Sequence, residues 1–123
     1  MLDECVQHVA DMLTAAGIPA TGDPRDLNLP GAWVEPATVA FDTFDAQQAE
    51  VTMSVHLVTP DNGPMASMSA LSDMLLTVRG LGLRMANITT EGITLTNHSP
   101  DPLPALTFSV AVEWTPSNGR HSR

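Results

Sequence analysis

The stretch EVTMSVHLVTPDNGPMASMSALSDMLLTVRG, Glu50 to Gly80, decides the fold expected for this chain. From Val51 to Leu57, apolar residues alternate with small or polar ones, which is the pattern of a β-strand with one buried face. The turn-forming residues 59–64 then separate this strand from a helix. Apolar residues recur in the helix at spacings of three and four, and they form a stripe of Met68, Leu71, Leu75 and Val78, with Met74 at its margin. We therefore expect the strand face and the helix stripe to be buried together or against a shared partner.

The segments on either side of this stretch predict further elements. Residues 2–16 carry one apolar stripe and end at Gly17, which predicts an N-terminal helix. Residues 32–42 predict a strand at a sheet edge, interrupted near Pro36 because proline cannot donate a ladder hydrogen bond. The polar residues that follow predict an antiparallel connection into the central strand. Residues 88–96 and the final apolar–polar alternation predict two more strands, and the last strand has one apolar face of Leu106, Phe108, Val110, Val112 and Trp114.

The expected order is thus helix, two strands, helix, two strands. Because the long strands are apolar on one face only, both helices are expected on that face. This predicts a two-layer α+β fold with a mixed or antiparallel sheet of four to five strands. A length of 123 residues fits one domain, which we place at residues 1–116, with residues 117–123 as a flexible polar tail.

Charge and composition exclude several classes of function. Fourteen acidic residues stand against five arginines, there is no lysine, and the formal net charge is −9, so a protein that grips nucleic acid is not expected. No apolar run approaches the ~20 residues of a membrane span, and Asp3 and Glu4 do not fit a signal peptide. The single cysteine, Cys5, excludes an internal disulfide, is typical of a reducing cytosol and is expected to be buried.

Residues with reactive side chains do not form a recognisable catalytic or metal-binding pattern. The four histidines lack metal-ligand spacing, the serines lack a nucleophile elbow and the glycines form no phosphate loop, so we predict no enzyme, no metal and no cofactor. Met65, Met68 and Met74 are expected to fill the core. Asp42, Asp45 and Glu50 are interpreted as a solvated acidic hairpin. The second sheet face is small and polar, and it would either meet water or, in an oligomer, pack on a neighbour or line a channel; its members are Thr52, Ser54, His56, Thr107, Ser109 and Glu113.

Four segments carry a resemblance to a known family: AAGIPA (15–20), DLNLPGAWVEP (26–36), VTMSVHLV (51–58) and LPALTFSV (103–110). In these segments and in its overall arrangement, residues 1–115 resemble the tail terminator, or tail completion, proteins of long-tailed phages (siphoviruses), especially those of actinobacteria. The motifs concern fold and turn chemistry and carry no catalytic signature.

The resemblance implies a structural virion protein of the tail–neck region, assembled in the host cytoplasm. Family members form a ring of six identical subunits that caps the tail tube, ends its polymerisation and joins it to the head–tail connector or stopper protein. DNA would pass through an acidic channel without specific binding. A ring needs a heterologous subunit interface, for which the candidates are Leu27, Asn28, Leu29 and Trp33. Asp42, Asp45 and Glu50 are the candidates for the channel lining.

Two alternatives stay open. The chain could be another phage neck or tail component, such as a stopper or a tube-forming subunit. It could also be a small-molecule-binding α+β module that uses a Met-lined space between helix and sheet.

Overall fold

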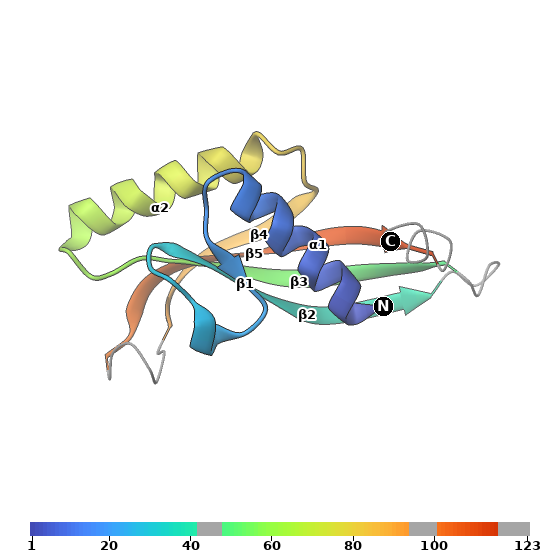
Figure 1. Cartoon of the computed structure of the whole chain (residues 1–123). Coiled ribbons are helices and arrows are strands. Elements are labelled where there is room, and N and C mark those ends of the chain that lie inside the picture. The colour runs from blue at the N-terminus through green and yellow to red at the C-terminus, as the bar shows by residue number, and fades with distance from the viewer. Residues whose placement is uncertain (42–47, 94–100, 116–123) are drawn as a thin grey trace.

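The structure, a computed structural model, describes residues 1–41, 48–93 and 101–115 (Figure 1). Two helices and five strands confirm the expected α+β class, and their predicted order is approximately matched. Two short elements that were not predicted, β1 and η1, precede the first long strand. The elements are α1 (Leu2–Ala15), β1 (Ala20–Thr21), the 3-10 turn η1 (Pro24–Asp26), β2 (Gly31–Phe41), β3 (Ala49–Val58), α2 (Pro64–Arg79), β4 (Met85–Ile93) and β5 (Leu103–Trp114).

The five strands form one mixed sheet in the order β1-β2-β3-β5-β4. Strand β1 is parallel to β2, and the other three pairs are antiparallel. The register of β2 shifts between Pro36 and Thr38, which confirms the predicted interruption. Because β1 pairs only with Ala32 and Trp33, the rest of β2 has no outer partner strand within the described residues. Strand β4 forms the opposite edge of the sheet.

Both helices lie on one face of the sheet, as expected (Figure 1). The alternation in β3 decides this arrangement, because Val51, Met53, Val55 and Leu57 are all fully buried on that face. The apolar side of β5 completes the same core, with Phe108 and Val110 at its centre. Cys5 is 3% exposed in α1, so its predicted burial is confirmed.

Helix α2 is rotated relative to the predicted stripe. Met68 is 53% exposed and Met65 is 76% exposed, so the expectation that these two methionines fill the core is wrong. Ser67 is buried instead: its amide bonds to the Gly63 carbonyl and its hydroxyl donates to the Pro60 carbonyl at 3.4 Å. The hydroxyl bond gives this inward-facing polar side chain a partner, and in the same helix orientation Met68 faces solvent. The side chains that α2 buries are therefore Ser67, Leu71, Met74 and Val78.

Strand β4 begins three residues earlier than predicted. Met85 already pairs with Val110, and the register then shifts between Ala86 and Thr89, where Asn87 has a φ of 57°. This left-handed residue breaks the alternation that would have marked the start of the strand in the sequence. Residues 94–96 of the predicted strand lie outside the described residues.

Candidate assembly surface

The sheet face opposite the two helices is the first candidate for a functional surface. Side chains of β3 and β5 meet there in register, with Ser54 opposite Ser109 and Thr52 opposite Ala111. These four are half-buried, small and uncharged. As predicted, this face contrasts with the apolar one, and we call it the open face.

His56 connects three strands on the open face. Its Nδ1 lies 2.7 Å from Thr107 Oγ1 on β5, and its Nε2 lies 3.2 Å from Glu35 Oε2 on β2. Its ring also packs at a tilt of 32° against Trp33, with 4.8 Å between the centroids. A carboxylate, an imidazole and a hydroxyl in this order also occur in acyl-transfer sites. Thr107 lies within β5, where it pairs with His56 on one side and with Thr89 on the other, so these contacts join neighbouring strands of the sheet. The arrangement therefore favours a structural cross-strand network.

The predicted interface residues form part of a second, smaller core beneath one end of the sheet. Leu27 is 2% exposed and packs with Val58, Leu103 and Ala105. Its side chain therefore packs within the subunit itself, and the role of this segment in a subunit interface stays a prediction. Leu29 and Trp33 are half-buried against the same cluster, whereas Asn28 is exposed. Alternation in the sequence could not find this core, because residues 27–29 belong to no long strand or helix.

The 3-10 turn η1, which precedes Leu27, is stabilised by hydrogen bonds to the Asp23 carboxylate. Asp23 accepts a hydrogen bond from the backbone N–H of Arg25 at 2.9 Å, and the Arg25 guanidinium donates to both oxygens of the same carboxylate. These bonds lower the pKa of Asp23 below its ordinary value of 3.8. Leu27 follows η1 directly and has an extended backbone.

Two carboxylates lie at the other end of the open face. Glu50 on β3 is directly opposite Glu113 on β5, and both are exposed. The Arg84 guanidinium lies 3.2 Å from Glu50 and offsets part of their repulsion. The other two predicted channel residues, Asp42 and Asp45, lie outside the described residues.

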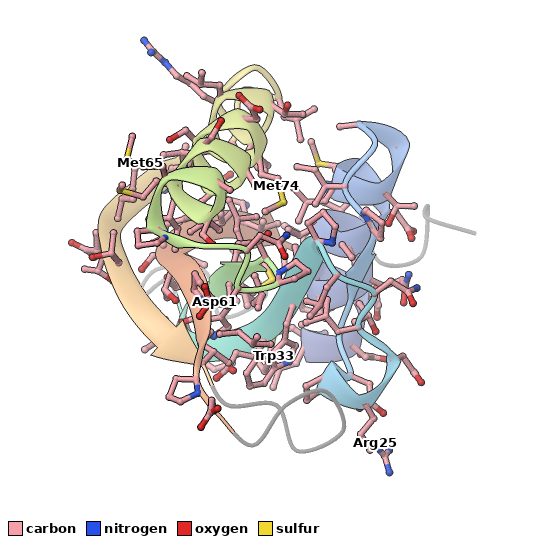
Figure 2. The ribbon with its side chains drawn as sticks, turned by 90° about the vertical axis from the view of Figure 1, so that its left-hand side faces the viewer. Arg25, Trp33, Asp61, Met65 and Met74 are labelled. Carbon is pink, nitrogen blue, oxygen red and sulfur yellow. The ribbon has the colours of Figure 1, made fainter. Side chains whose placement is uncertain are left out.

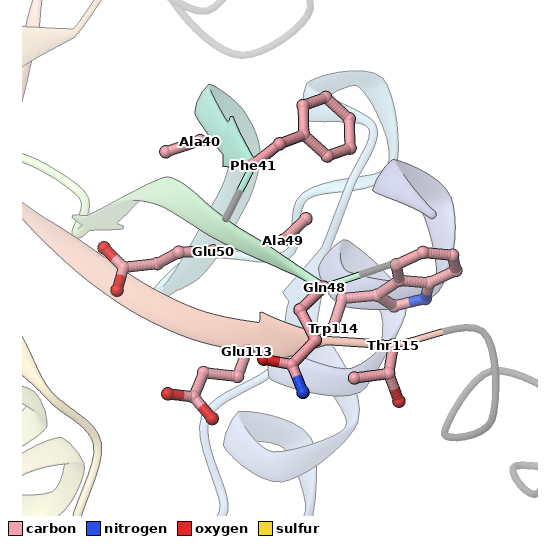
Figure 3. Close-up of a pocket in the computed structure, with 8 residues that line it drawn as sticks. All are labelled: Ala40, Phe41, Gln48, Ala49, Glu50, Glu113, Trp114 and Thr115. Carbon is pink, nitrogen blue, oxygen red and sulfur yellow. The ribbon is translucent and has the colours of Figure 1, made fainter. Parts of the chain in front are cut away.

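A hollow of about 340 Å³ adjoins these carboxylates at the ends of β2, β3 and β5 (Figure 3). Phe41, Gln48, Trp114 and Thr115 contribute to its wall together with Glu50 and Glu113. The indole Nε1 of Trp114 is buried and has no acceptor within the described part of the chain. The hollow was not predicted, because strand ends from distant parts of the sequence form it.

Two methionines pack between the helices and the sheet. Met53 is fully buried and Met74 is 9% exposed, and both belong to the main core. Both therefore contribute to the packing in the region where the sequence suggested a Met-lined ligand space.

No protein-family model matches the chain, and no curated protein matches it. Within the described residues, no group of three or more histidine, cysteine or acidic side chains is arranged to hold a metal ion. None of the described helices has the length and apolar composition needed to cross a membrane.

The exposed apolar side chains of α2 were missed by the sequence analysis. Met65, Met68 and Leu76 are 76%, 53% and 62% exposed. Successive helix residues are rotated by about 100°, which places these three on one flank of α2. Figure 2 shows Met65 on the side of α2 that faces away from α1, whereas Met74 lies between the two helices. The helix thus has two apolar stripes, and a helical projection would have revealed the second one.

Proposed function

We infer that this chain is a structural ring subunit that caps a phage tail tube and joins it to the head–tail connector. The observation that carries this proposal is the open face, on which the small uncharged side chains of Thr52, Ser54, Ser109 and Ala111 lie between the His56 network and the Glu50–Glu113 pair. A surface of this kind, placed around a channel, presents little for DNA to bind. The formal charge of −9 per subunit adds a repulsive potential toward phosphate groups. The resemblance of residues 1–115 to tail terminators supplies the class of assembly.

Tube growth is the direct test. The tail tube subunit encoded in the same genome is polymerised with and without this protein, and the products are imaged by negative-stain electron microscopy. We expect ring-shaped density at one tube end and arrested growth at that end. An equally acidic, unrelated protein of similar mass is the control. Tubes of unchanged length with bare ends would contradict the proposal, and long tubes formed by this chain alone would identify a tube subunit instead.

The mass of the particle is a second readout. A closed ring of six would have a mass of about 79 kDa, six times the 13.1 kDa of the chain. Native mass spectrometry of the protein, alone and after release from tubes, measures this value.

The acidic end of the open face has its own test. If Glu50 and Glu113 face a DNA channel, the rings of E50K/E113K should retain double-stranded DNA at low salt, and wild-type rings should not. The matched control is D11K/D73K, which makes the same charge change on exposed positions of the two helices. Equal DNA retention by both variants would show a general charge effect and remove these glutamates from the channel.

A further inference from the structure

The described large apolar side chains that are exposed fall into two groups on opposite sides of the subunit. Met65, Met68 and Leu76 on α2 form one group with Ile88 of the edge strand β4, which is 49% exposed. We call these four residues the α2 patch. Leu2 and Phe41, 38% and 60% exposed, form the second group, the α1 patch, where the N-terminal end of α1 lies over the end of β2 (Figure 1).

Opposite charges accompany the two patches. Arg79 is exposed and, by its helical position, lies on the same flank of α2 as Met68 and Leu76. Arg84 precedes β4, but its guanidinium pairs with Glu50 at 3.2 Å beside the acidic end of the open face, so it is not counted with the α2 patch. The α1 patch instead adjoins Asp3, 91% exposed, and Glu4, 43% exposed, two carboxylates that lie 3.2 Å and 3.5 Å from the single N-terminal ammonium group. The chain contains no lysine, so the exposed Arg79 gives the α2 side a distinct character.

We propose that the α2 patch of one subunit binds the α1 patch of a second copy of this chain, head to tail. The apolar side chains of each patch would be removed from water against those of the other, and Arg79 beside one patch would meet the carboxylates of Asp3 and Glu4 beside the other. The two patches differ in composition and lie on opposite sides, so the contact is heterologous and can be repeated around a ring. The inference rests on the proposed ring and names the surfaces that would close it.

The open edge of β4 supports the same surface. Strand β4 is the last in the sheet, and the α2 patch includes a side chain from this strand. Edge strands with exposed apolar neighbours promote association unless they are covered, and a neighbouring subunit would cover this one.

The first variant removes the α2 patch. M68E/L76E places two carboxylates at exposed positions, so the fold should survive, as circular dichroism and thermal melting would verify. Sedimentation and native mass spectrometry up to about 200 μM should show self-association weakened by about 100-fold or more, because two central apolar contacts are lost. The matched control, A66E/T77E, makes the same charge change at exposed positions on the other flank of the same helix and should associate like wild type.

A second variant tests the head-to-tail geometry. D3K/F41K disables the α1 patch and leaves the α2 patch intact. Each variant alone should remain at 13.1 kDa, and their equimolar mixture should form a one-to-one pair of about 26 kDa through the single intact interface. A symmetric α2-to-α2 contact would instead let D3K/F41K form a dimer by itself, and that result would overturn the proposal.

The remaining outcomes also decide. The assignment would be overturned if M68E/L76E formed particles of the same mass as wild type. It would also be overturned if A66E/T77E lost association to the same extent, or if the mixture of the two patch variants formed no pair. A wild-type chain that stays at 13.1 kDa throughout would overturn it as well, although capping of tubes could still be observed separately. If six-subunit rings form without the α2 patch, the proposed function stands and this inference fails. If the patches join subunits into open chains that never cap tubes, the inference stands and the proposed function fails.

Discussion

His56 lies where β2, β3 and β5 meet on the open face, and its two ring nitrogens contact groups on different strands. The side chain is only 12% exposed, so a loss of these contacts would leave polar atoms poorly solvated. His56 therefore links three neighbouring strands, whereas the sequence indicated only that it belongs to the polar face.

The cross-strand contact of His56 can be measured by a double-mutant cycle. H56F retains a ring beside Trp33 and removes the nitrogens, and T107V removes the hydroxyl while keeping the shape. We expect a coupling energy of about 0.5–1.5 kcal/mol between the two changes in urea unfolding. Strict additivity of their free energies of unfolding would mean that the 2.7 Å contact contributes nothing.

The Cys5 thiol should be unreactive in the folded chain. It is 3% exposed, and burial raises its pKa, so both access and the thiolate fraction are reduced. At about pH 8, a thiol-specific reagent should label the protein only after denaturant is added. C5A supplies the blank, and fast stoichiometric labelling without denaturant would contradict the burial of this side chain.

The lowered pKa of Asp23 predicts that the free energy of unfolding decreases in acid. Its folded-state pKa lies below the ordinary 3.8, mainly because the Arg25 side chain donates hydrogen bonds to it. The ionised carboxylate therefore stabilises the fold fully above the unfolded-state pKa of 3.8. This contribution is lost as the pH falls through the lower folded-state pKa. Melting of wild type and D23N should differ at pH 6 and converge in strong acid. A difference that stays constant across this range would exclude the carboxylate as its source.

In helix α2, two overlapping sets of residues with helical spacing could have faced the core. The sequence favoured Met68, Leu71, Leu75 and Val78, but the helix buries Ser67, Leu71, Met74 and Val78. Both sets have helical spacing, so periodicity alone could not choose between them. The hydrogen bond from the Ser67 hydroxyl to the Pro60 carbonyl agrees with the set that is buried.

Two alanine substitutions in α2 separate these stripes. L71A should lower the free energy of unfolding by about 2–4 kcal/mol, because Leu71 is 6% exposed in the main core. M68A should change it by no more than about 0.5 kcal/mol, since Met68 is largely in water. Alanine favours helix at both sites, so the comparison isolates burial. If both variants lost a similar free energy of unfolding in urea, Met68 would have to be part of the core.

Over the whole molecule, the main core draws on segments from α1 to β5 and ends at Trp114. Truncation after Pro116 should therefore change the free energy of unfolding by no more than about 0.5 kcal/mol. The truncation removes Arg120 and Arg123, so the formal charge moves from −9 to −11. Denaturant unfolding of the shortened and full-length chains checks the prediction, and a lost fold would place the domain boundary further along the chain.

Local pattern in the sequence was enough to predict the class of the fold, the pairing of β2 with β3 and the apolar faces of β3 and β5. These features follow from local periodicity, because residues two apart in a strand or three to four apart in a helix share a face wherever the element is placed. The sequence also determined the strong negative charge and the scarcity of basic groups.

Tertiary structure alone decided the insertion of β5 between β3 and β4, the burial of Leu27 beneath the sheet, and the flank of α2 that is left in water. Each depends on contacts between residues far apart in the chain, and local pattern does not tell which elements distant in the sequence become neighbours. The candidate site follows the same division. Alternation predicted the open face. The two apolar patches, with charges of opposite sign beside them, can be recognised only from the arrangement of α1, β2, α2 and β4 in the structure.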